Sequence, residues 1–175
     1  MRSTLNVGWF ADISLNDRSD VGGKGGSLGE LQRAGIAVPP GFVVKTAAFE
    51  AMLASLESES PLRSRIQSLA PDNLAAIAAC CEQIRARVES APIPAAVLHE
   101  IAEAHAALCG NKTLVPVAVR SSATTEDAVD ASFAGLQDTY LWVNDLGKAL
   151  QKVKSCWASL YSLESVSYRL RRGFA

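Results

Sequence analysis

Apolar residues recur every three or four positions in several stretches of the chain, and each stretch predicts a helix with one buried face. Pro94 suits the first turn of one of these helices, and Gly110 suits its end. A shorter helix is expected around Ile66. The predicted buried faces are Phe49, Met52, Leu53 and Leu56; Leu74, Ile77, Cys81, Ile84 and Val88; Val97, Ile101, Ala104 and Leu108; and Leu146, Leu150, Val153, Trp157 and Leu160.

Short apolar runs between the helices predict strands. The segment VPPGFVV at 38–44 reads as a rigid turn followed by a strand. VPVAV at 115–119 predicts a buried strand, and TYLWV at 139–143 predicts another. The last residues, SYRLRRGFA, show no signal that ends a helix.

The segment VGGKGGSLGEL at 21–31 departs from this pattern, with five glycines and one lysine. Glycines let a backbone approach phosphate closely, and Lys24 adds a positive charge near a helix start. Ser27 and Glu30 fit a capping box, which predicts that this helix starts at Ser27, and Gly35 suits its end. The pattern is not a Walker P-loop, because a glycine follows the lysine. The segment is either a phosphate-binding loop or a flexible surface turn with a solvated lysine.

A second candidate is VAVRSSATTED at 117–127, where a predicted strand ends at Arg120. Ligands of α/β proteins often lie beyond the carboxyl ends of strands, and an arginine there suits two hydrogen bonds to phosphate. Ser121 and Ser122 could add hydroxyl or backbone donors. The alternative is an ordinary strand end, with the arginine paired at the surface to an acidic residue of the same loop.

The segment DASFAGLQDTYLWV at 130–143 supplies a third candidate loop. Gly135 lets the backbone approach a ligand closely. The alternative is a hairpin-like connection with a buried Phe133. Two glycine-bearing loops and one strand-end arginine in a nearly neutral chain favour a nucleotide as ligand over a nucleic acid.

The composition limits the alternatives further. The chain has 175 residues, of which 49% are hydrophobic and 20% charged, and its net charge is −1. Such a chain is typical of one soluble globular domain and lacks the basic surface of a nucleic-acid-binding protein. No apolar run reaches the roughly 20 residues of a membrane span, and a cytoplasmic location is expected. The four cysteines contain no CxxC pair and are expected to be buried free thiols.

The chain resembles the N-terminal part of the ATP-binding domain shared by phosphoenolpyruvate synthases, pyruvate phosphate dikinases and rifampin phosphotransferases. The resemblance rests on VGGKGGSLGEL, GIAVPPGFVVKTAAFEAML, VAVRSSATTED followed by DASFAGLQDTYLWV, and CWASLYS. It spans nearly the whole chain and is weakest over 57–112. It implies an α+β fold in which residues 1–175 form the first lobe of an ATP-grasp nucleotide-binding domain, with a helical insertion at about 57–112.

The resemblance also implies roles for individual residues. Lys24 looks like the family lysine that contacts ATP phosphates, and Arg120 looks like the arginine that grips the phosphate chain, which makes it the expected catalytic residue. Gly135, Thr139 and Tyr140 match positions that line the nucleotide. Family members often carry other residues where this chain has two glycines after the lysine, but the lysine itself is kept.

Other parts of the family's machinery are expected outside this chain. The resemblance places the acidic Mg²⁺ ligands and the adenine site in a second lobe, and the phosphorylated histidine in a separate mobile domain. Glu126 and Asp127 are therefore not assigned as metal ligands. His99 and His105 lie in a helical stretch without the family's histidine motif and are expected to be structural or exposed. The expected cofactors are ATP and Mg²⁺, and the expected partners are the second lobe and the phosphohistidine domain.

The expected activity belongs to a longer protein. ATP phosphorylates a histidine, and the group passes to pyruvate, as in phosphoenolpyruvate synthases. Pyruvate phosphate dikinase and rifampin phosphotransferase chemistry are alternatives. A nucleotide-sensing module without catalysis and a helical interaction domain also remain open. The 175 residues alone are expected to be inactive.

Overall fold

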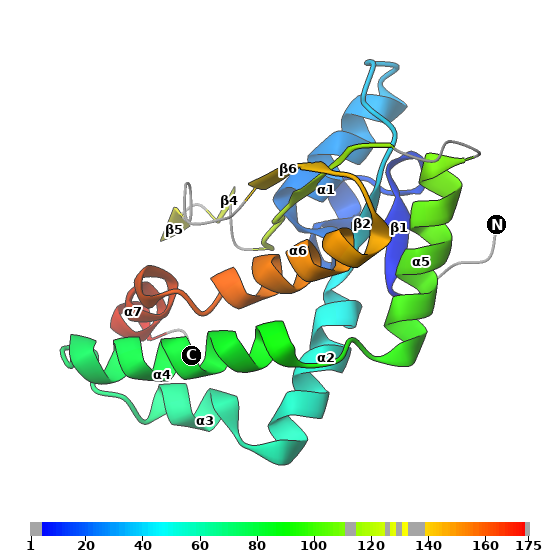
Figure 1. Cartoon of the computed structure of the whole chain (residues 1–175). Helices are drawn as coiled ribbons and strands as arrows, with labels where there is room; N and C mark the ends of the chain where they lie inside the picture. The colour runs from blue at the N-terminus through cyan, green and yellow to red at the C-terminus, as the bar shows by residue number, and fades with distance from the viewer. Residues whose placement is uncertain (1–4, 111–114, 125–126, 129–130, 133–138, 174–175) are drawn as a thin grey trace.

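The computed structural model in Figure 1 describes residues 5–110, 115–124, 127–128, 131–132 and 139–173, of which 127–128 and 131–132 are described by backbone alone. In chain order its elements are β1 (Val7–Trp9), the 3-10 helices η1 (Phe10–Asp12) and η2 (Leu15–Asp17), α1 (Arg18–Arg33), β2 (Phe42–Val44), α2 (Thr46–Glu59), α3 (Leu62–Gln67), α4 (Leu74–Ser90), α5 (Ala95–Cys109), β3 (Val117–Arg120), β4 (Asp127–Ala128), β5 (Ala131–Ser132), β6 (Thr139–Val143), α6 (Leu146–Ser159) and α7 (Leu163–Arg172). This mixture of helices and short strands agrees with the predicted α+β class.

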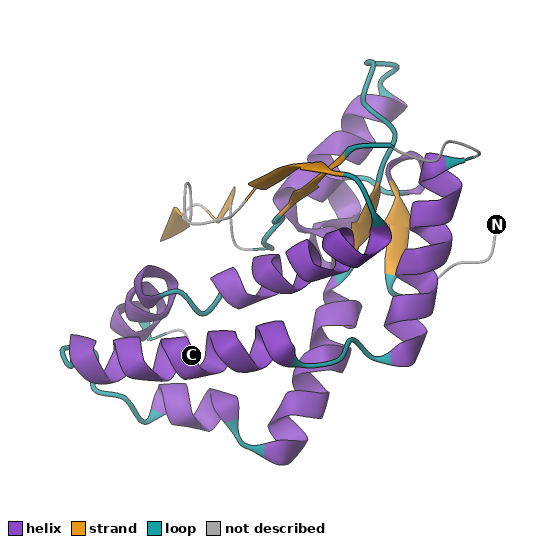
Figure 2. Ribbon diagram, viewed as in Figure 1, coloured by secondary structure: helices purple, strands orange, loops and turns teal. Residues whose placement is uncertain are grey.

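The described strands form antiparallel pairs rather than one continuous sheet: β1 with β2, β3 with β6, and β4 with β5. Figure 2 shows these strands as small pieces among the helices. In the β3–β6 pair, Arg120 lies opposite Thr139 and Val117 lies opposite Val143. The register shifts between these pairs, so that Leu141 and Trp142 of β6 bulge out against a single residue of β3.

The helices enclose the hydrophobic core. α4 packs against α3, α6 and α7, and α2 packs against α3 and α1 (Figure 1). Trp157 of α6 is 8% exposed, and its ring centroid lies 5.9 Å from that of Phe49 in α2. The largest fully buried side chains are Met52, Leu62, Ile77, Ile84, Ile101, Val21, Val88, Val97 and Val166. Burial of such side chains is the main favourable contribution to the stability of the fold.

The predicted helices and most of their buried faces are confirmed. Met52, Ile84 and Ile101 are fully buried, each on the face that the spacing predicted. Leu74 is an exception, because it is the first residue of α4 and is 47% exposed. The predicted short helix around Ile66 is α3. The described cysteines are all free, and Cys109 alone among them is only half-buried.

Three predicted features at element boundaries are wrong. The helix of the glycine segment begins at Arg18, not at Ser27, and the capping box lies just ahead of it, at Ser14 and Asp17. The strand predicted as buried begins at Val117 and alternates half-buried with exposed residues, because one face of the β3–β6 pair is open. The last helix does have a stop, at Gly173, whose φ is 71°.

Candidate functional site

The glycine segment is a broken helix. Gly22, inside α1, has a φ of 72° and a ψ of 173°, so one helical piece ends before it and a second begins at Gly23. A positive φ of this size is easily adopted only by glycine. Lys24 is half-buried and lies in the first turn of the second piece. The positive end of a helix dipole therefore lies beside the lysine.

The second predicted motif docks directly on this break. The backbone N–H of Gly25 donates a hydrogen bond to the Oγ atom of Ser122 at 3.0 Å, although the two residues are 97 positions apart. Ser122 Oγ in turn donates to the carbonyl oxygen of Val21 at 2.9 Å. The N–H of Gly23 donates to the carbonyl oxygen of Ala123 at 3.1 Å. The chain itself therefore occupies two of the amides at the new helix start.

These contacts change the interpretation of the glycines. A Cβ atom on Gly22 would overlap the carbonyl oxygen and the hydroxyl group of Ser122. The absence of a side chain at Gly22 thus allows the Ser122 backbone to approach α1, whereas the sequence suggested that the glycines make room for phosphate. The result is that the strand end carrying Arg120 is joined to the helix start carrying Lys24.

The β3–β6 pair divides the predicted nucleotide residues between two faces. Arg120 and Thr139 lie opposite each other and are both exposed, so they share the open face of the pair. Tyr140 is half-buried, and the Nζ atom of Lys152 in α6 lies 4.3 Å from its ring centroid. Tyr140 therefore faces α6, away from Arg120.

Two exposed apolar residues of β6 were not singled out by the motifs. Leu141 is 64% exposed and Trp142 is 81% exposed. Trp142 has a φ of 58°, in the left-handed region that residues with bulky side chains rarely adopt. The sequence contained no signal for this conformation, because it results from the bulge in the β3–β6 register.

Some predicted residues cannot be placed. Gly135 and Glu126 lie outside the described residues, and the side chain of Asp127 does as well. Among the described residues, no three histidine, cysteine, aspartate or glutamate side chains gather in a way that could hold a metal ion. His99 is exposed and lies 3.5 Å from Glu103, measured from Nε2 to Oε1.

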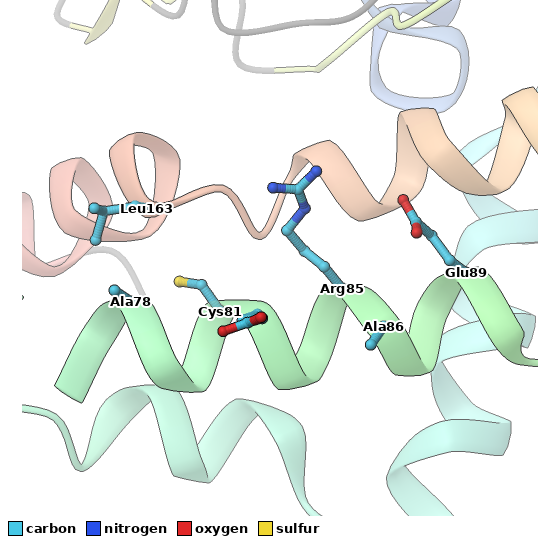
Figure 3. Close-up of a pocket in the computed structure, with 7 residues that line it drawn as sticks. Ala78, Cys81, Arg85, Ala86, Glu89 and Leu163 are labelled. Atoms are coloured by element: carbon cyan, nitrogen blue, oxygen red, sulfur yellow. The ribbon is translucent and has the colours of Figure 1, made fainter. Parts of the chain in front are cut away.

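A cavity of about 320 Å³ lies elsewhere, along α4 and beside Leu163 of α7 (Figure 3). It is lined by Ala78, Cys81, Glu82, Arg85, Ala86, Glu89 and Leu163, and by none of the predicted nucleotide residues. Burial, with a smaller contribution from the neighbouring Cys80, raises the pKa of Cys81 to about 11. A thiol with this pKa is a weak nucleophile at neutral pH, so the cavity offers little reactive chemistry.

None of the helices in the described part of the chain combines the length and the apolar character needed to cross a membrane.

Comparison with known proteins places the chain in a family. The sequence model of the family described as "Pyruvate phosphate dikinase, AMP/ATP-binding domain" matches residues 18–175. The chain therefore belongs to this family of AMP/ATP-binding domains. The resemblance inferred from the sequence motifs is confirmed, and both the Lys24 and the Arg120 segments lie within the matched region.

Several individual proteins similar to this chain are named as phosphoenolpyruvate synthases. The chain is 42% identical over 171 residues to a probable phosphoenolpyruvate synthase of Archaeoglobus fulgidus, a match that covers 97% of this chain and 23% of that protein. It is 35% identical over 202 residues to the phosphoenolpyruvate synthase of Pyrococcus furiosus, covering 96% of this chain and 25% of the relative. It is 37% identical over 183 residues to the phosphoenolpyruvate synthase of a Synechocystis strain, a match that covers 99% of this chain and 22% of that protein. The chain thus spans about a quarter of the length of these relatives.

Proposed function

We propose that this chain binds ATP and holds the phosphates between Lys24 and Arg120. Membership in a family of AMP/ATP-binding domains supports the nucleotide as ligand. The observation that carries the proposal is the hydrogen bond from Gly25 to Ser122, because it joins the helix start beside Lys24 to the strand end beside Arg120. The contact between these two segments supports a site to which both cations contribute.

The side chains of Lys24 and Arg120 would bind the phosphates of ATP in different ways. The lysine ammonium is a compact charge next to a positive helix end, where it attracts an anion of high charge density such as a triphosphate. The guanidinium of Arg120 is exposed at the end of β3 and can donate two parallel hydrogen bonds to phosphate oxygens. Phosphoryl transfer depends chiefly on positioning and charge stabilisation, which these groups supply.

Thr139 is a better candidate for nucleotide contact than Tyr140. It lies opposite Arg120 on the open face of the β3–β6 pair, whereas Tyr140 packs towards Lys152 and α6. We therefore assign Thr139 to the nucleotide and Tyr140 to the support of the strand. Gly135, which precedes β6 in the sequence, remains part of the proposal through the family resemblance.

In a longer protein, the chain serves as the first lobe of an ATP-grasp domain of a phosphoenolpyruvate synthase-like phosphotransferase. ATP phosphorylates a histidine on a separate domain, and the phosphoryl group passes to pyruvate. The names and lengths of the relatives support this role. The ligands of Mg²⁺ are assigned to the second lobe of such a protein through the family resemblance.

Calorimetric titration of the chain with ATP tests the proposal. Lys24→Ala and Arg120→Ala should each weaken ATP binding by about tenfold or more, because each removes a charge-assisted contact to phosphate. Inorganic tripolyphosphate, which carries the phosphates without the adenosine, should lose affinity in the same two variants. Arg33→Ala is a matched control, since it removes an exposed charge at the far end of α1. Equal ATP affinity in the unaltered chain and in both site variants would show the proposal to be wrong.

A further inference from the structure

We infer that Ser122 is a positioning residue of the nucleotide site, which fixes Lys24 and Arg120 relative to each other without contacting the nucleotide. The inference rests on the proposed function and deepens it. The Ser122 hydroxyl group is assigned to binding backbone groups of α1, whereas the motif alone suggested that it donates a hydrogen bond to phosphate.

The contacts of Ser122 span the break in α1. Its hydroxyl oxygen accepts a hydrogen bond from the N–H of Gly25 at 3.0 Å, on one side of Gly22. Its hydroxyl proton is donated to the carbonyl oxygen of Val21 at 2.9 Å, on the other side. One side chain therefore closes both ends of the break. The neighbouring residue reinforces this contact, because the carbonyl oxygen of Ala123 accepts from the N–H of Gly23 at 3.1 Å.

Proton counting separates positioning from direct binding. A serine hydroxyl carries a single proton and two acceptor positions. In this structure the proton is committed to Val21, and the Gly25 N–H uses one acceptor position. A phosphate group that carries no proton can only accept hydrogen bonds. Ser122 therefore has no donor left for ATP unless its contact with Val21 breaks.

Ser122 lies close in the structure to the backbone of both Arg120 and Lys24, so its contacts affect the relative position of these two residues. Arg120 precedes Ser122 by two residues and lies at the end of β3. Lys24 immediately precedes Gly25, whose N–H donates to the hydroxyl oxygen of Ser122. Loss of the hydroxyl would leave the Gly25 N–H unpaired and would weaken the attachment of the Arg120 strand end to α1, which would then rest on the hydrogen bond from Gly23 to Ala123. Small displacements of this kind between two contacts to one ligand weaken binding strongly.

The experiment compares Ser122→Ala, Ser122→Thr and Thr124→Ala in the full chain. Thr124→Ala is the control, because it removes an exposed hydroxyl group two residues later in the same segment. ATP affinity is measured by calorimetry well below the unfolding temperature of every variant. Amide hydrogen exchange is measured at Gly25 in the nucleotide-free chain, so that the contact is tested independently of ATP.

We expect Ser122→Ala to weaken ATP binding about tenfold and to speed exchange at Gly25 by at least tenfold, since an unpaired amide exchanges faster. Ser122→Thr retains the hydroxyl and should restore both values to within about threefold of the unaltered chain. Thr124→Ala should change neither value. A purely structural role would lower the unfolding temperature of Ser122→Ala and leave ATP affinity at lower temperature unchanged.

The outcomes separate this inference from the proposed function. If ATP binding depends on Lys24 and Arg120 but is unchanged in Ser122→Ala, the positioning role is overturned and the proposed function stands. If the unaltered chain binds no ATP, both are overturned. If Gly25 exchange is the same in Ser122→Ala and in the unaltered chain, the contact itself does not operate in solution and the inference fails.

Discussion

Gly22 and Ser122 are in direct contact, so close that a Cβ atom on the glycine would overlap the serine's carbonyl oxygen and hydroxyl group. Gly22 also has a φ of 72°, which places the break of α1 at the point of contact. The glycine segment is therefore a surface on which the Arg120 strand end docks. This arrangement explains how charged residues from two distant motifs come to lie in the same part of the molecule.

Replacing Gly22 should be costly for stability. Gly22→Ala places a side chain at a left-handed φ and against the Ser122 backbone. We expect the free energy of unfolding to fall by about 3 kcal/mol, which combines the conformational cost with the steric overlap. Urea unfolding followed by circular dichroism measures this change.

Gly35 provides a control for that prediction. Its φ is 76°, but a Cβ atom there would meet nothing within 4 Å. Gly35→Ala should therefore cost only the conformational part, about 1 kcal/mol. Equal losses in the two variants would contradict a close contact between Gly22 and Ser122.

The exposed Trp142 is predicted to reduce the stability of the fold. It is 81% exposed, so its ring gains little from burial, and its φ of 58° is unfavourable for a bulky residue. Trp142→Asn should raise the free energy of unfolding by about 1 kcal/mol, because asparagine tolerates the left-handed region.

Leu141→Ala is the comparison for Trp142. Leu141 is 64% exposed and does not have a positive φ. Its replacement should change the free energy of unfolding by less than about 0.5 kcal/mol. A lower stability of Trp142→Asn than of the unaltered chain would mean that the tryptophan makes favourable contacts that outweigh its backbone conformation.

How far the sequence alone could predict this structure depends on the range of the interactions involved. The faces of α4 and α5 were predictable, because helical periodicity is local and the core residues Ile77 and Ile101 obey it. The start of α1 was not. Ser27 and Glu30 fit a capping box, but the helix begins nine residues earlier, at Arg18, and breaks where Ser122 docks.

The charged residues of the candidate site were predictable from the sequence, but the contacts that position them were not. Lys24 and Arg120 stood out by charge, by their position beside glycines or a strand end, and by the family resemblance. The role of Ser122 could not be read from the sequence, because it depends on a contact between segments 97 residues apart. The separation of Thr139 from Tyr140 follows from the strand register, which the sequence does not specify across a bulge.

Cys81 should react slowly with alkylating reagents in the folded chain. Burial raises the pKa of its thiol from an ordinary value of 9.0 to about 11. The reactive form is the thiolate, so at pH 8 its population is about a hundredfold below that of an ordinary thiol. The rate of iodoacetamide labelling at Cys81, followed by tandem mass spectrometry, should rise about a hundredfold when urea unfolds the chain. Similar rates in the folded and unfolded chain would contradict the burial of this thiol.

The most direct test of the account is a nuclear magnetic resonance titration of the isotopically labelled chain with ATP. We expect the amide signals of Gly23 to Gly25 and those of Arg120 to Ser122 to shift together and to yield one common dissociation constant. Shifts confined to one of the two segments, or two different constants, would contradict the claim that both segments form a single phosphate site.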